Sequence, residues 1–204
     1  MSSMAAKIVE MPPHVAAQNR ARREWTALLG MIFVLAAWAM MFAALFFSYA
    51  IVRVRSNVWP PVNAPEFSIM LPAINSFVIA LSSLVLHRGV SHLRKEKFAA
   101  FRNAFILGSV FAALFLGLQW HFWSDLMATG LTPDSGSYAS IIFGLTWVHA
   151  AHVLIGFFAL VYLSIQAWRQ AYRLENSITV RLWTMYWHFV GIVWLLMFVT
   201  IFIM

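Results

Sequence analysis

Apolar residues in this chain are gathered into five long runs that contain no Lys, Arg, Asp or Glu. Each run has about 18 residues or more, the length at which a continuous apolar segment indicates a helix that crosses a bilayer. The pattern therefore predicts an all-α fold, an integral membrane bundle of five transmembrane helices. The runs extend over Trp25 to Val52, Ile69 to Leu86, Ala104 to Trp123, Ile141 to Leu163 and Leu182 to Ile203.

Composition agrees with this pattern, because 62% of the residues are hydrophobic and only 10% are charged. Soluble domains carry about 25% charged residues. Residues 1–24 are polar and lack an apolar centre, so they are expected to form a cytoplasmic polar tail and not a cleavable signal peptide. Residues 25–204 are expected to form one five-helix transmembrane domain. Cysteine is absent, which excludes disulfides and thiolate metal ligands.

The basic residues predict the orientation of the bundle. Twelve of the 14 Lys and Arg residues lie in the tail and in the connections after the second and fourth runs, and the other two are Arg53 and Arg55. Basic flanking residues remain in the cytoplasm, so the N-terminus is expected inside and the C-terminus outside. The net charge of +7 then reflects membrane topology, and no nucleic-acid partner is expected. The twelve are Lys7, Arg20, Arg22, Arg23, Arg88, Arg94, Lys95, Lys97, Arg102, Arg169, Arg173 and Arg181.

Polar side chains within the runs are the candidates for function, because they are costly in lipid and normally face the interior of a bundle. Those singled out as candidates are Asn75, Gln119, His149, His152 and His188. No Asp or Glu accompanies them. Proton pumps usually place a carboxylate at membrane depth, so the sequence argues against proton translocation by this chain alone.

The histidines allow two interpretations. Thr146, His149 and Gly156 share one face of the fourth predicted helix, and a rise of about 1.5 Å per residue puts His152 and His188 within a few ångströms of one depth. Two histidines on different helices could hold a haem axially, whereas a metal centre needs at least three ligands. The alternative is that each imidazole bonds a neighbouring helix or a lipid headgroup. The scarcity of histidines at one depth favours this second interpretation, with no metal site.

Six motifs, in order along the chain, resemble those of subunit III of the haem-copper terminal oxidases. TWVHAAHVLIG, residues 146–156, is similar to Thr-x-x-His-x-x-His-Val-x-x-Gly, and YWHFVGIVWL, residues 186–195, to Tyr-Trp-His-Phe-Val-Asp-Val-Val-Trp-Leu. The other four are VWPPV at 58–62, PAINSFVIALSS at 72–83, Gln119 in place of the Gln of Gln-x-x-Glu-Tyr, and SGSYAS at 135–140. The resemblance covers everything after the polar tail.

The resemblance to subunit III implies an accessory, non-catalytic subunit in a bacterial inner membrane, where members often have five helices. Such a subunit carries no haem or copper itself. It stabilises the catalytic subunit I, binds phospholipid and supports proton uptake, while subunits I and II hold the haem and copper. Trp-Pro-Pro favours cytochrome c over quinol as electron donor, and membership of a larger respiratory supercomplex is an open alternative. The residues assigned to interhelical or lipid-headgroup contacts are His149, His152, His188, Asn75, Gln119 and Trp187.

Three positions depart from the family pattern, and all three are lost carboxylates. The membrane-embedded glutamate of the first helix aligns with Trp38, the Glu of Gln-x-x-Glu-Tyr is Phe122, and the Asp after His-Phe-Val is Gly191. A role that depends on a buried glutamate is therefore in doubt, and a divergent branch serving a quinol oxidase or a nitric oxide reductase is one alternative. The other is a free-standing membrane cytochrome with His152 and His188 as haem ligands.

Overall fold

Five α-helices and one π-helical turn account for the secondary structure of the described residues in the computed structural model, which are 12–59, 61, 69–169 and 177–203. Each of the five helices is long and apolar enough to cross a membrane. The prediction of an all-helical chain with five spans is therefore confirmed. The elements are α1 Pro13–Arg55, α2 Met70–Arg94, α3 Phe98–Ala128, α4 Ser137–Trp168, α5 Ser177–Phe198 and the π-helical turn η2 Val199–Ile203.

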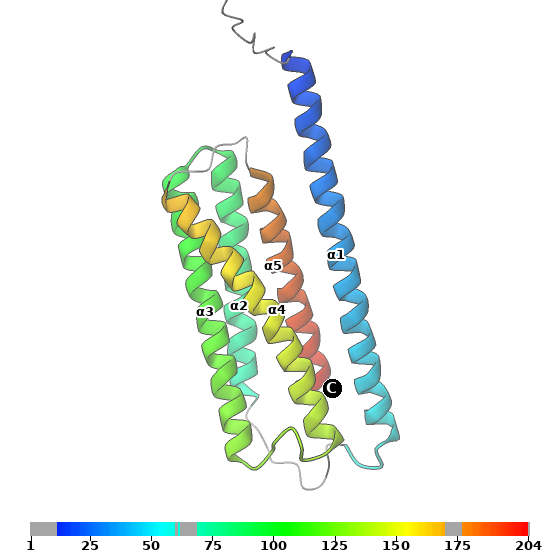
Figure 1. Cartoon of the computed structure of the whole chain (residues 1–204). Coiled ribbons are helices and arrows are strands. Elements are labelled where there is room, and N and C mark those ends of the chain that lie inside the picture. The colour runs from blue at the N-terminus through cyan, green and yellow to red at the C-terminus, as the bar shows by residue number, and fades with distance from the viewer. Residues whose placement is uncertain (1–11, 60, 62–68, 170–176, 204) are drawn as a thin grey trace, which may run out of the picture.

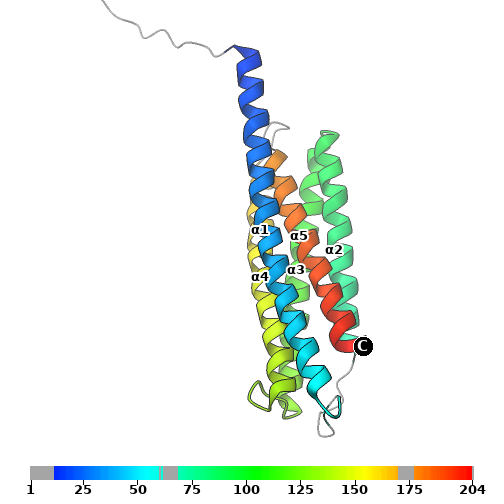
Figure 2. The same ribbon diagram turned by 90° about the vertical axis from the view of Figure 1, so that its right-hand side faces the viewer.

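The helices extend beyond the apolar runs that predicted them. α1 begins twelve residues before Trp25, and α2 continues past Leu86 to Arg94. At about 1.5 Å per residue, the 43 residues of α1 span about 65 Å, roughly twice a hydrocarbon core. Its first turns therefore project beyond the other helices (Figures 1 and 2). Outside the described residues lie 1–11 of the predicted tail, including Lys7, together with Arg173 and positions 60 and 62 of VWPPV.

The helices α2 to α5 pack into a bundle, and α1 lies along one side of it (Figures 1 and 2). α2 contacts α3 and α5, α3 contacts α4, and α4 contacts α5, while the main contacts of α1 are with α5 and α4. The start of α1 and the end of α5 lie toward opposite ends of the bundle (Figure 1), as five crossings require. Which end faces the cytoplasm stays a prediction from the basic residues.

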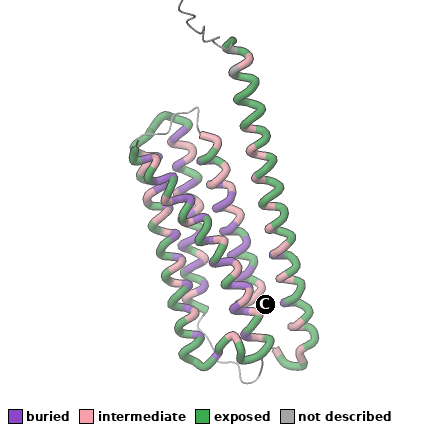
Figure 3. Tube along the Cα trace, in the orientation of Figure 1, coloured by how far each residue is buried: buried purple, intermediate pink, exposed green. Residues whose placement is uncertain are grey.

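Burial is distributed unequally between the helices. Buried positions recur along α2 to α5, whereas α1 is exposed along most of its length (Figure 3). Phe42 and Tyr49 are the side chains of α1 that are buried in the described structure. The Tyr49 hydroxyl donates to the backbone oxygen of Thr200 in η2 at 3.0 Å, and Trp59 packs edge-on against Tyr49 and Tyr138. These contacts attach the second half of α1 to the bundle.

Small residues set the closest helix contacts, as expected where lipid removes the hydrophobic drive for helix association. A Cβ atom at Gly108 of α3 would lie 2.6 Å from Cδ2 of Leu86 on α2. The Ser82 hydroxyl of α2 donates to the Gly108 backbone oxygen at 3.3 Å. The absence of a side chain at Gly108 therefore allows both the packing and the hydrogen bond between α2 and α3.

Candidate functional site

A pair of buried amides joins α2 to α3. Asn75 Nδ2 donates to Gln119 Oε1 at 3.3 Å, and each side chain is 1% exposed. The remaining amide atoms, Asn75 Oδ1 and Gln119 Nε2, are buried with no hydrogen-bond partner among the described residues. The structure therefore brings together two of the polar residues singled out from the sequence, in a single interhelical contact.

We expect this amide pair to show energetic coupling. Asn75→Leu or Gln119→Leu alone leaves the other amide buried without its partner and should cost about 1–2 kcal/mol. The double variant should cost less than the sum by about 0.5–1.5 kcal/mol, which thermal denaturation in mild detergent can measure. The control combines Asn75→Leu with Ser164→Ala, and the losses in stability of these two variants should be additive. The Ser164 hydroxyl contacts Ser109 of α3, which lies about 15 Å along the helix axis from Gln119. Additive losses for Asn75 and Gln119 would contradict the pairing.

Thr146 begins the polar face of α4. Its Oγ1 donates to the backbone oxygen of Ile142 at 2.8 Å and accepts a hydrogen bond from Trp123 Nε1 of α3 at 3.1 Å. The side chain is fully buried. The threonine of the motif therefore links α4 to α3.

His149 lies one turn further along α4, enclosed by aromatic rings. It is 1% exposed, and its ring centroid lies 5.5 Å from that of Trp194, and 6.2 Å from those of Phe42 and Phe115. Neither ring nitrogen has a hydrogen-bond partner within the described part of the chain. Four helices thus meet around a buried imidazole, which functions here as a packing element between α1, α3, α4 and α5.

His152 is partly buried and is oriented by its own helix. Its Nδ1 lies 2.7 Å from the backbone oxygen of Val148, and the indole of Trp38 on α1 packs edge-on against the imidazole with centroids 4.5 Å apart. The backbone oxygen of His152 accepts a hydrogen bond from the Tyr186 hydroxyl at 2.8 Å. This residue therefore connects α4 to both α1 and α5.

Gly156 completes the motif, and aromatic side chains of α5 lie directly against its backbone. A Cβ atom at this position would lie 2.9 Å from Trp187 Cε3 and 3.0 Å from Tyr186 Cε1. Both aromatic side chains are 1% exposed, and Trp187 Nε1 has no hydrogen-bond partner among the residues described. Trp187 thus contributes an interhelical packing contact, and the glycine makes room for it.

His188 lies apart from the other two histidines. It is two residues beyond Tyr186, about 200° around the helix, so it faces α2, where its ring centroid lies 6.0 Å from that of His87. Similar depth did not bring His188 beside His152, because depth alone says nothing about the direction in which a helical side chain points. His87 was not singled out from the sequence. The sequence contains one signal that could have indicated His87. His87 and Arg94 are seven residues apart, and Arg181 and His188 have the same separation.

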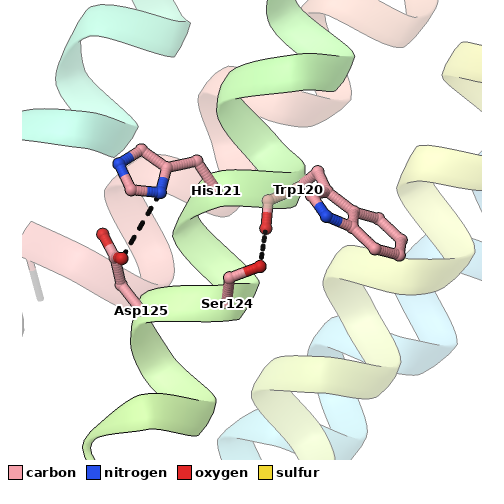
Figure 4. Close-up of polar contacts among 4 residues, drawn as sticks. All are labelled: Trp120, His121, Ser124 and Asp125. Atoms are coloured by element: carbon pink, nitrogen blue, oxygen red, sulfur yellow. Dashed lines mark hydrogen bonds and ion pairs between the residues drawn. The ribbon is translucent and has the colours of Figure 1, made fainter.

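The structure contains no cluster of metal-ligating side chains among the described residues. Within the described ranges, no set of three or more His, Asp or Glu side chains comes together as it would to hold a metal ion. His121 and Asp125, near the end of α3, lie 3.3 Å apart between Nδ1 and Oδ1, and both are more than half exposed (Figure 4). Ser124, one residue before Asp125, donates to the Trp120 backbone oxygen at 3.0 Å. His121 therefore lies on the surface of the described structure.

Comparison with known proteins places the chain in a family. Residues 17–204 match the family model described as cytochrome c oxidase subunit III. The chain belongs to this family. The match covers all five helices of the structure from Ala17 onward, and the resemblance in the sequence motifs is thereby confirmed.

Relatives of this subunit III chain include proteins from both cytochrome c and quinol oxidases. It is 31% identical to cytochrome c oxidase subunit 3 of Synechocystis sp. over 87% of this chain and 75% of that protein. It is 28% identical to cytochrome c oxidase subunit 3 of Corynebacterium diphtheriae over 98% of each chain. It is also 26% identical to cytochrome bo(3) ubiquinol oxidase subunit 3 of Pseudomonas aeruginosa, over 81% of this chain and 78% of that protein.

Family membership and the five spans together make this chain a subunit III of the haem-copper oxidases and a multi-pass bacterial membrane protein. Membership implies association with the other oxidase subunits.

The three positions that the motif resemblance predicts to have lost a carboxylate are occupied by packing contacts. Trp38 contacts the rings of His152 and Tyr186, and Phe122 is 3% exposed in a second apolar cluster. A Cβ atom at Gly191 would lie 3.4 Å from the Ser83 hydroxyl. Aromatic side chains fill the first two sites, and at the third the missing side chain brings α5 close to α2.

Proposed function

We propose that this chain is a non-catalytic accessory subunit of a cytochrome c oxidase in the bacterial inner membrane. It packs beside subunits I and II, which bind the haem and copper, and it stabilises the catalytic subunit. The observation that supports this proposal most strongly is the family match over residues 17–204. The polar face of α4 agrees with it, because Trp123 of α3 donates to Thr146, Tyr186 of α5 donates to the backbone oxygen of His152, and His149 packs among aromatic rings.

The proposed contribution is structural support, with lipid binding and assistance to proton uptake in the partner. None of the apolar runs contains an Asp or Glu, so a proton path through this chain would lack the carboxylates that such relays normally use. Support for proton uptake would then act through the position of the catalytic subunit. Turnover of the oxidase with and without this chain, measured as the pH rises and protons become scarcer, tests that part of the proposal.

Cytochrome c is the proposed electron donor. The Trp-Pro-Pro sequence of residues 59–61 and the relatives from Synechocystis sp. and Corynebacterium diphtheriae support it. A quinol oxidase is the second candidate, because relatives in Pseudomonas aeruginosa and Buchnera aphidicola are named subunits of cytochrome bo(3) ubiquinol oxidase. Oxidation of cytochrome c or of quinol by the purified complex distinguishes the two donors.

Co-purification tests the accessory role. The tagged chain, extracted in mild detergent, should bring down a haem-bearing catalytic subunit in near-equal amount, because a subunit of a stable complex keeps its partners through purification. Mass spectrometry identifies and quantifies the partners. The matched control is the same tag on the Gly156→Val variant, whose α4 to α5 packing is disturbed and which should recover less of the catalytic subunit. Recovery of the chain alone, carrying its own visible absorption, would contradict the proposal and favour a free-standing haem protein.

A further inference from the structure

Four buried polar atoms in the region where α2, α3 and α4 meet have no hydrogen-bond partner among the described residues. They are Asn75 Oδ1, Gln119 Nε2 and the two ring nitrogens of His149. Each of the three side chains is 1% exposed. Buried polar atoms are normally paired with protein groups or with an ordered water, and the bilayer core offers no bulk water to replace a missing partner. These four atoms therefore require a ligand that can form hydrogen bonds.

The three side chains are connected through direct contacts. Asn75 and Gln119 share the hydrogen bond between α2 and α3. Trp194 of α5 links this pair to the histidine. Its Nε1 donates at 3.0 Å to the hydroxyl of Ser76, the residue next to Asn75. On its other side, the centroid of the indole lies 5.5 Å from that of the His149 ring.

Gln119 and His149 also lie at a similar level on neighbouring helices, which run in opposite directions (Figure 1). The ring of Phe115, one turn before Gln119, has its centroid 6.2 Å from that of His149. Trp123, one turn after Gln119, donates to Thr146 of α4. These two contacts lie on either side of Gln119, so it is within about one turn of the level of His149. This level is nine residues from the end of α3, about 14 Å along the axis, and is therefore far from the aqueous surface.

We propose that the polar node formed by Asn75, Gln119 and His149 binds one water molecule. The water accepts a hydrogen bond from Gln119 Nε2. It donates to Asn75 Oδ1 and to the unprotonated ring nitrogen of His149, which is an acceptor in the neutral imidazole. A buried water typically makes about three hydrogen bonds, and this node supplies one donor and two acceptors. The water joins α2, α3 and α4 at a single point.

A water fits the polar node better than direct pairing or a metal ion does. Two amides that pair side by side make two hydrogen bonds, whereas Asn75 and Gln119 make one, at 3.3 Å. This distance is longer than the usual value of about 2.9–3.0 Å. A metal cation would meet no carboxylate in the node, and a metal centre needs at least three ligands, which no cluster of His, Asp or Glu side chains in the described ranges provides. A water is uncharged and needs only the donor and acceptors that are present.

The inference concerns the interior of this chain and holds whichever oxidase subunits accompany it. Its direct test is an electron cryo-microscopy map of the full-length chain, with its partners or with a bound antibody fragment that adds mass. The resolution must be one at which ordered waters are visible elsewhere in the protein. The expected result is a density peak within hydrogen-bonding distance of Asn75, Gln119 and His149. A map with other buried waters but none here, or with a second direct bond between the two amides, would overturn the proposal.

A double-mutant cycle tests the same node without a map. His149→Phe keeps an aromatic ring but removes both nitrogens, and Gln119→Leu removes the donor. Because both variants disrupt the same water, their combined effect on the unfolding equilibrium constant should fall short of the product of the single effects by about threefold to tenfold. Denaturant titration in mild detergent measures these constants.

The matched control combines His149→Phe with Ser82→Ala, which removes a different hydrogen bond between α2 and α3. The effects of these two variants should multiply. Equally independent effects of His149→Phe and Gln119→Leu would contradict a shared water. A variant that fails to fold leaves the map of the unmodified chain to decide.

Discussion

Replacing Gly156 by Val is expected to lower the free energy of unfolding by about 3 kcal/mol, at the upper end of the range for overpacking a core. The first added carbon would lie 2.9 Å from Trp187 and 3.0 Å from Tyr186. Neither ring has free space to move into, because both are 1% exposed. Displacing Tyr186 would also break its hydrogen bond to the backbone oxygen of His152. Thermal denaturation in mild detergent measures the loss.

The control is Gly144→Val on the same helix. A Cβ atom there meets nothing within 4 Å, so this variant carries the same change in helix propensity without the clash. It should remain within about 1 kcal/mol of the unmodified chain. Similar losses at Gly156 and Gly144 would show that the glycine of the motif is not required for the approach of α5 to α4.

The sequence predicted the number and the approximate places of the helices, but not their ends. An apolar run reports the part of a helix that lies in hydrocarbon, whereas backbone hydrogen bonding continues into the interface wherever the residues allow it. Arg and Lys are good helix formers, and α2 accordingly continues through Arg88 to Arg94. α1 begins at Pro13, at the first helical position, where proline is favoured. Charged residues mark the ends of the predicted apolar runs, but the helices continue past them.

The polar face of α4 could be predicted from spacing alone. Thr146, His149 and Gly156 fall on one face by helical periodicity, and the structure buries all three. Their neighbours could not be predicted, because these come from the distant segments that contribute Trp123, Phe42 and Trp187.

The pairing of His188 was missed for a geometric reason. Depth in the membrane follows from counting residues, but the partner of a side chain depends on its angular position and on which helix packs there. His152 faces α1 while His188 faces His87 of α2. The apolar pattern does not say which helices pack against each other. The axial haem pair of His152 and His188, considered from depth alone, therefore does not correspond to these contacts.

The position of α1 also depends on few contacts, and Phe42 is expected to be the main one. Phe42→Ala should weaken the attachment of α1 by about 3 kcal/mol, the low end of the range for a buried phenylalanine, since lipid adds little hydrophobic drive between helices. The ring is 2% exposed and packs against His149 and His152, with centroids 6.2 and 5.2 Å away. Its loss leaves a gap between α1 and α4.

The measurement is retention of α1 after its chain connection to α2 is cut. A protease site placed within residues 62–68 allows cleavage of the purified chain, and a tag on residue 1 then reports how much of α2 to α5 remains bound. A loss of about 3 kcal/mol corresponds to roughly a hundredfold weaker association, so the Phe42→Ala fragments should separate while the unmodified fragments stay together. Phe47→Ala is the matched control, because that ring lies on the same helix but is 68% exposed. Equal retention by the Phe42 and Phe47 variants would mean that Tyr49, Trp38 and Trp59 suffice to hold α1, and that the buried Phe42 ring is dispensable for the attachment.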